Sequence, residues 1–156
     1  MHKNMLALIL IGLYLLFVGC ELFEKDEITY DYPTITKIKI NKIPELNDEG
    51  YAWDEFSPPD IYCIVIDDQE NIYYTSITQQ NVSNSELPIT FKPEKLELKD
   101  SERELYVRVY DEDLTSEDII DTVGPFSAQM IMDDSSNVYT MENYTWTLEV
   151  SVTLKW

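Results

Sequence analysis

The chain has 156 residues, of which 30 are Asp or Glu and 11 are Lys or Arg, so its formal net charge at pH 7 is −19. Such an acidic surface repels nucleic acid, and we expect no nucleic-acid partner. The one histidine is His2, at the extreme N-terminus, which excludes histidine-activated nucleophiles and histidine-ligated zinc from any domain that follows it.

Residues 1–19 are typical of a secretory signal peptide. His2 and Lys3 precede the apolar run MLALILIGLYLLFV, which is short for a membrane span and is soon followed by the polar ELFEKDE. Removal of this segment leaves residues 20–156, the size of one domain.

The end of the apolar run, LFVGC, resembles the lipobox of bacterial lipoproteins. The resemblance implies that Cys20 becomes the mature first residue and carries a lipid anchor that includes palmitate. Residues 20–32 are then a tether, and the protein lies in the cell envelope, on the periplasmic or surface face of the outer membrane. An ordinary secretory signal that ends in a chance cysteine is the alternative.

Residues 33–156 are predicted to form one all-β domain. Proline and Asn-Ser clusters separate short apolar stretches, and no long stretch has a helical period. The expected strands are, in chain order, TKIKINKI, DIYCIVID, NIYYTSI, LPITF, LYVRVYD, SAQMIM and TWTLEVSVTLKW. These short strands predict an antiparallel β-sandwich of about eight strands.

Two of these stretches define the expected core. LYVRVYD alternates Leu105, Val107 and Val109 with polar or aromatic residues, which predicts one buried face. DIYCIVID is apolar on both faces, as expected of a central strand that is covered on both sides. The last stretch places one apolar set on a single face: Trp146, Leu148, Val150, Val152, Leu154 and Trp156.

Carboxylates gather at the ends of two predicted strands. Asp111 and Asp113 lie two residues apart as LYVRVYD ends, so an extended backbone points both side chains the same way, and a turn brings Asp118 back toward them. Far upstream, NDEGYAWDEFSPPDIY contains Asp54 and Asp60. If the two segments meet, all ligands are oxygens, which calcium prefers. A solvated acidic surface is the alternative.

PPDIYCIVIDD and LYVRVYDEDLTSEDII together resemble the C2 domain, with ITKIKINKIP, LPITF and LELKD in the same order along the chain. The resemblance implies a C2-like sandwich in which Asp54, Asp60, Asp111, Asp113 and Asp118 bind Ca2+. The interval from Asp111 to Asp118 is one residue shorter than the family pattern.

In membrane-docking C2 domains, apolar loop tips enter lipid beside the calcium site. The resemblance therefore implies partner contact through Trp53, Phe56 and Leu114, although for Trp53 we favour the alternative that it pins its loop onto the sandwich. We expect a lipid-anchored binding module, not an enzyme, that contacts an anionic lipid or an envelope protein. The alternatives are a carbohydrate-binding β-sandwich with structural calcium and a metal-free structural envelope lipoprotein.

Overall fold

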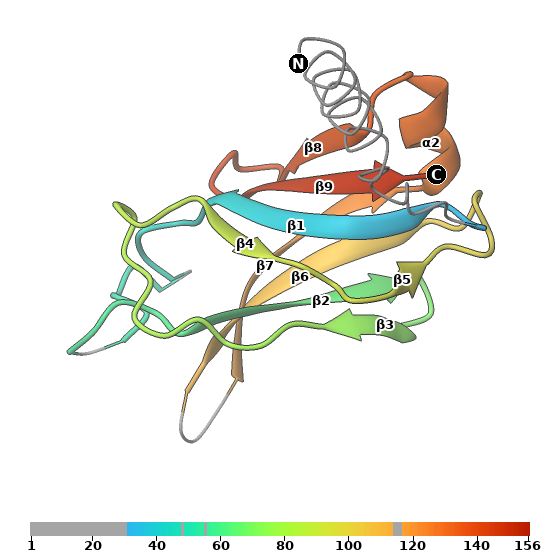
Figure 1. Cartoon of the computed structure of the whole chain (residues 1–156). Coiled ribbons are helices and arrows are strands. Elements are labelled where there is room, and N and C mark those ends of the chain that lie inside the picture. The colour runs from blue at the N-terminus through green and yellow to red at the C-terminus, as the bar shows by residue number, and fades with distance from the viewer. Residues whose placement is uncertain (1–30, 48, 55, 114–116) are drawn as a thin grey trace, which may run out of the picture.

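The computed structural model describes residues 31–47, 49–54, 56–113 and 117–156. Two antiparallel sheets pack face to face, which confirms the predicted β-sandwich (Figure 1). The signal peptide, Cys20 and Leu114 lie outside the described residues. The strands are β1 (Thr34–Lys42), β2 (Ile61–Asp67), β3 (Ile72–Thr75), β4 (Ile89–Phe91), β5 (Leu96–Glu97), β6 (Leu105–Glu112), β7 (Glu117–Phe126), β8 (Val138–Glu142) and β9 (Glu149–Lys155).

One sheet has the strand order β4-β1-β9-β8, with β5 also paired to β1, and the other has the order β3-β2-β6-β7. The core lies between them, where the alternating apolar residues of both sheets interdigitate. Fully buried members include Ile38, Val65, Val107, Phe126 and Val152. Among the described residues, no helix has the length and apolar character needed to cross a membrane.

Strand β2 is buried at all seven positions, as its two-sided apolar pattern predicts. Ile61, Cys63 and Val65 face the main core. On the opposite face, the ring of Tyr62 stacks on Tyr110 with 4.8 Å between ring centroids. Aromatic side chains of the neighbouring strand therefore cover the outer face of β2 without a third layer of backbone.

The last strand is shorter than predicted. Leu148 and the apolar residues of β9 are buried, but Trp146 precedes the strand with φ 61° and its side chain is 68% exposed. Trp156 follows the strand and is 54% exposed. The prediction that both tryptophans share the core face is wrong, because the regular extended backbone covers only Glu149–Lys155.

The segment SAQMIM was expected to be a strand and instead forms the helix α2 (Ala128–Asp133). The Ser127 hydroxyl accepts a hydrogen bond from the Met130 backbone N–H at 3.2 Å, which caps the first turn. The helix buries Ala128 and Ile131, which lie three residues apart on one face. Its single apolar turn does not alternate long enough to favour a strand.

The pairing register places three loops at one end of the sandwich. Ile61 pairs with Asp111, which puts the start of β2 beside the end of β6. Lys42 pairs with Glu149, and Glu142 pairs with the same residue. The β1–β2, β6–β7 and β8–β9 connections therefore share this end, whereas α2 and the C-terminus lie at the other (Figure 1).

Candidate metal centre

Asp111 extends the core-facing row of β6. Leu105, Val107 and Val109 are buried on this row, and Asp111 follows them with no exposed surface. Strand β6 lies between β2 and β7, so Asp111 is flanked by Ile61 on one side and Asp118 on the other. A carboxylate thus occupies a position where the alternation of the strand requires an apolar side chain.

Only one of the two carboxylate oxygens of Asp111 has a protein partner. The Asp60 backbone N–H donates to Oδ1 at 2.8 Å. Oδ2 is buried and accepts no hydrogen bond from any residue that the structure describes. Because a buried charged oxygen without a partner carries a large desolvation cost, this atom requires a ligand or a proton.

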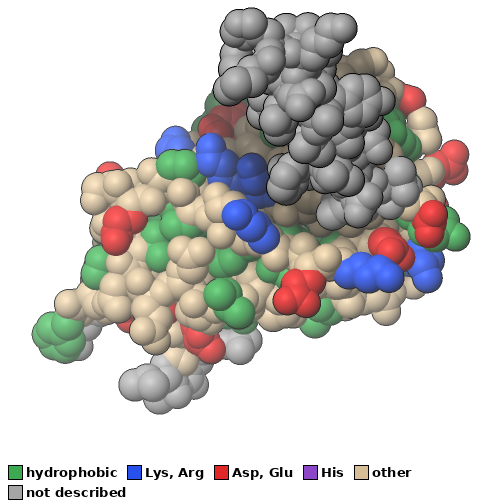
Figure 2. Space-filling model, viewed as in Figure 1, with side chains coloured by type: hydrophobic (Ala, Val, Ile, Leu, Met, Phe, Trp, Pro, Cys, Tyr) green, Lys and Arg blue, Asp and Glu red, His purple; other side chains and the backbone are tan. Residues whose placement is uncertain are grey.

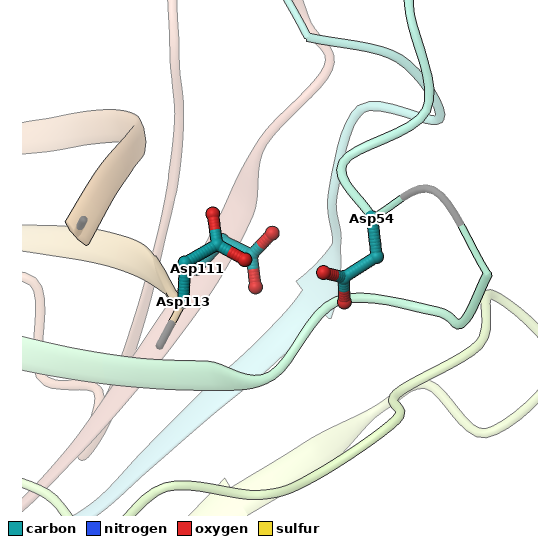
Figure 3. A group of neighbouring side chains, drawn as sticks. All are labelled: Asp54, Asp111 and Asp113. Atoms are coloured by element: carbon teal, nitrogen blue, oxygen red, sulfur yellow. The ribbon is translucent and has the colours of Figure 1, made fainter. Parts of the chain in front are cut away.

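Asp54 and Asp113 bring their carboxylates to Asp111 from two directions (Figure 3). One carboxylate oxygen from each of the three residues lies within 4.8 Å of the others. Asp113 follows Asp111 by two residues and leaves the strand on the same side. Asp54 comes from the β1–β2 connection, where the Ser57 hydroxyl donates to its Oδ2 at 3.0 Å.

The structure places Asp60 and Asp118 beside this group but not in it. The Oδ1 atom of Asp60 accepts the Asn81 backbone N–H at 2.7 Å, which ties Asp60 to the β3–β4 connection. Asp118 lies opposite Asp111 across the β6–β7 pairing, with its side chain exposed. Three of the five predicted ligands therefore converge, and the other two border the site.

The electrostatics of the group disfavour negative charge. Burial raises the pKa of Asp111 to about 6, with smaller contributions from the charges of Asp54, Asp113 and Asp60, while the hydrogen bond from the Asp60 backbone lowers it. Burial also raises the pKa of Asp113, followed by its hydrogen bond with Asp54 and the charges of Asp54, Asp118 and Asp60. Apart from the Asp60 hydrogen bond, these effects penalise negative charge on the two carboxylates, so a bound cation would stabilise this arrangement.

The donor set suits a hard cation. All three converging groups are carboxylates, and no nitrogen or sulfur ligand lies among them. Calcium takes six to eight oxygen ligands in flexible geometry, which matches carboxylates that come from loops and a strand end. The unpartnered Asp111 Oδ2 is the observation that shows the fit, because a solvated acidic surface has no reason to bury such an atom.

The predicted contact residues differ in exposure. Trp53 packs against the edge of the core, and its Nε1 donates to the Pro44 carbonyl at 2.9 Å, as expected of a side chain that pins its loop. Phe56, in the same connection, is 91% exposed. Of the predicted contact residues in the described part of this loop, Phe56 is the one whose side chain is exposed and available to a partner.

Sequence spacing did not identify two neighbours of the site. Asn81 contributes only a backbone N–H, and Ser57 contributes a hydroxyl from a run of turn residues. The Asn81 contact depends on the β3–β4 connection crossing to the start of β2, where Gln79 also pairs with Ile61. No residue type or interval in the sequence signals that crossing.

Known structures share this architecture. A structure described as a C2 domain aligns over 80% of this chain and 97% of its own length, with a TM-score of 0.51 and 14% sequence identity. A C2 domain protein from Ramazzottius varieornatus aligns over 79% of this chain and 91% of its own, with a TM-score of 0.45 and 14% identity. No family model and no curated protein matches the sequence. The first of these two structures shows that the chain has a C2-like fold.

Proposed function

We propose that the protein is a lipid-anchored binding module of the bacterial cell envelope whose acidic loops bind calcium and contact an anionic lipid or protein partner. The observation that carries the proposal is the buried Oδ2 of Asp111, which has no hydrogen-bond partner in the described residues, in a carboxylate that lies close to two others. The C2-like fold supports it, because the group lies at the end of the sandwich where loops from both sheets meet.

Each carboxylate has a distinct part in this proposal. Asp111 is fixed by the sheet and by the Asp60 backbone N–H, so it provides the rigid ligand. Asp54 and Asp113 come from connections and close around it. Calcium, when bound, supplies the positive charge that offsets the three carboxylates and attracts an anionic group to this end. Phe56, exposed on the same connection as Asp54, would then add apolar contact.

Co-sedimentation with vesicles tests this proposal. A Cys20→Ser chain that begins at residue 20, without the apolar segment 1–19, cannot be acylated and is mixed with phosphatidylcholine vesicles that contain phosphatidylglycerol or lipopolysaccharide. We expect pelleting in calcium and release in chelator, because the acidic loops otherwise repel the anionic surface. The Cys20 chain, acylated in cells, should stay with membranes in chelator.

Matched variants separate the calcium site from general charge. Asp111→Asn with Asp113→Asn should abolish calcium-dependent pelleting. Asp68→Asn with Asp134→Asn removes the same charge from exposed positions outside the site and should leave pelleting unchanged. Equal pelleting of both double variants, or no response to calcium in any vesicle, would refute a lipid partner. The proposal that Cys20 is acylated fails if the Cys20 chain made in cells is released from membranes in chelator, as the Cys20→Ser variant is expected to be.

A binding function also fits the side-chain chemistry. The one histidine of the chain lies in the N-terminal segment, and the converging groups are three aspartates. We therefore propose that the module binds and does not catalyse. This proposal fails if the purified chain turns over a substrate and loses that activity in the Asp111→Asn variant.

A further inference from the structure

A surface hollow of about 710 Å3 lies where strand β8 and the β8–β9 loop meet the end of β7. Its lining includes Tyr139 and Glu142 of β8, Tyr144 and Trp146 of the loop, and Gly124 of β7. None of the three converging aspartates lines it. Any function of this hollow therefore goes beyond the calcium-dependent role proposed above.

Two large aromatic side chains of the loop point into solvent. Tyr144 is 99% exposed and Trp146 is 68% exposed. Trp146 also has φ 61°, a left-handed conformation that costs about 1 kcal/mol or more for a bulky residue. Exposure and backbone strain both oppose folding, and their coincidence at one residue indicates that the loop is shaped for binding.

Asn143 holds this loop rigid from within. Its Oδ1 accepts the backbone N–H groups of Thr147 and Leu148 at 2.8 and 2.9 Å. Its Nδ2 donates to the Thr145 and Thr147 hydroxyls and to Asp121 on β7. The backbone N–H of Asn143 donates to the Leu148 carbonyl at 3.0 Å, which closes the loop. Because the loop backbone is already ordered, binding to its aromatic rings costs little further backbone entropy.

The side chains around the hollow indicate the class of ligand. Glu142 is the one charged residue among the described lining residues, and Lys42 donates from its Nζ to the backbone carbonyl of the lining residue Trp146. One negative and one positive group therefore lie beside the hollow, so a neutral ligand suits it better than an ion. Within the described residues, the Glu142 carboxylate and the Tyr139 hydroxyl make no side-chain hydrogen bond and are available to a ligand. Met141 is almost fully buried, and the exposed Val138 of β8 is not part of the lining, so β8 offers little aliphatic surface to an apolar peptide anchor within the hollow itself.

We propose that this hollow binds a neutral oligosaccharide. The rings of Tyr144 and Trp146 stack on the C–H faces of sugar rings, since both are large, flat and exposed. The Glu142 carboxylate accepts hydrogen bonds from sugar hydroxyls, and the Tyr139 hydroxyl donates or accepts. The site uses neither the aspartate group nor a metal, so it should bind sugar in the presence of chelator.

Affinity electrophoresis of the full-length chain, in chelator, tests the assignment. The probes are soluble neutral polysaccharides, namely xylan, galactomannan, glucomannan and laminarin, in separate gels. We expect at least one to retard the native chain, and Trp146→Ala to weaken that binding about tenfold, the factor that 1.4 kcal/mol represents. Trp156→Ala, which removes a similarly exposed tryptophan beyond the end of β9, should bind as the native chain does.

The salt dependence of binding distinguishes a neutral sugar ligand from a basic peptide ligand. Binding of a neutral sugar should not change between low and high salt, whereas binding of an oligolysine peptide to Glu142 should weaken steeply. The assignment is overturned if no polysaccharide retards the native chain, if Trp146→Ala binds as tightly as the native chain, or if only oligolysine binds. Loss of vesicle binding alone leaves it intact, because the two sites share no residue.

Discussion

Asp111 is the residue on which the proposed calcium site depends. It takes the position of a core residue at the end of β6 and is fully buried, yet one of its oxygens has no partner among the described residues. The alternating stretch before it predicts that its side chain points inward, and the interval of two predicts that Asp113 follows on the same side. Sequence alone could not predict that Asp60 supplies a backbone N–H to Asp111 while its own carboxylate turns to Asn81.

The raised pKa of Asp111 predicts a pH-dependent stability in chelator. Burial raises this pKa from 3.8 to about 6, so between these values the folded state binds more protons than the unfolded state. The unfolding free energy contributed by Asp111 therefore falls as pH rises from about 4 to 6. Urea unfolding at pH 4 to 7 should show the native chain losing stability relative to Asp111→Asn over this range. A difference that stays constant with pH would contradict the burial argument.

At the scale of elements, the clean alternation in β6 and the two-sided apolar run in β2 were sufficient to predict both strands and their burial. Strands β7 and β8 were not predicted. The β6–β7 pairing contains register shifts, and β7 begins with acidic residues, so its apolar positions do not keep a period of two. Strand β8 has five residues with one buried side chain, Met141, and only its pairing with β9 makes it a strand.

The β8–β9 loop depends on Asn143, which lies at the centre of its hydrogen bonds. Asn143→Ala would leave the part-buried N–H of Thr147 and the buried N–H of Leu148 without side-chain acceptors. We expect this change to lower the unfolding free energy by about 2 kcal/mol, measured by urea unfolding. Asn137→Ala, at an exposed position before β8, should change it by less than about 0.5 kcal/mol. Equal effects of the two variants would contradict the central role of Asn143.

At the scale of the whole molecule, charge is unevenly distributed. The net charge is −19, yet Lys37, Lys39 and Lys42 lie on β1, and basic side chains gather over this part of the molecule in Figure 2. The three converging aspartates occupy the loop end, where their like charges repel one another. Calcium binding at that end would therefore increase the stability of the folded state as a whole, because the unfolded chain does not assemble the group.

Thermal unfolding of the full-length chain with calcium and with chelator tests the central claim most directly. Calcium at a hundredfold excess over its dissociation constant should add about 2.7 kcal/mol to the unfolding free energy. Asp111→Asn with Asp113→Asn should remove this gain and, in chelator, should stabilise the fold by relieving repulsion, whereas Asp68→Asn with Asp134→Asn should keep the gain. An unchanged melting temperature of the native chain at millimolar calcium would contradict the claim that Asp54, Asp111 and Asp113 hold an ion.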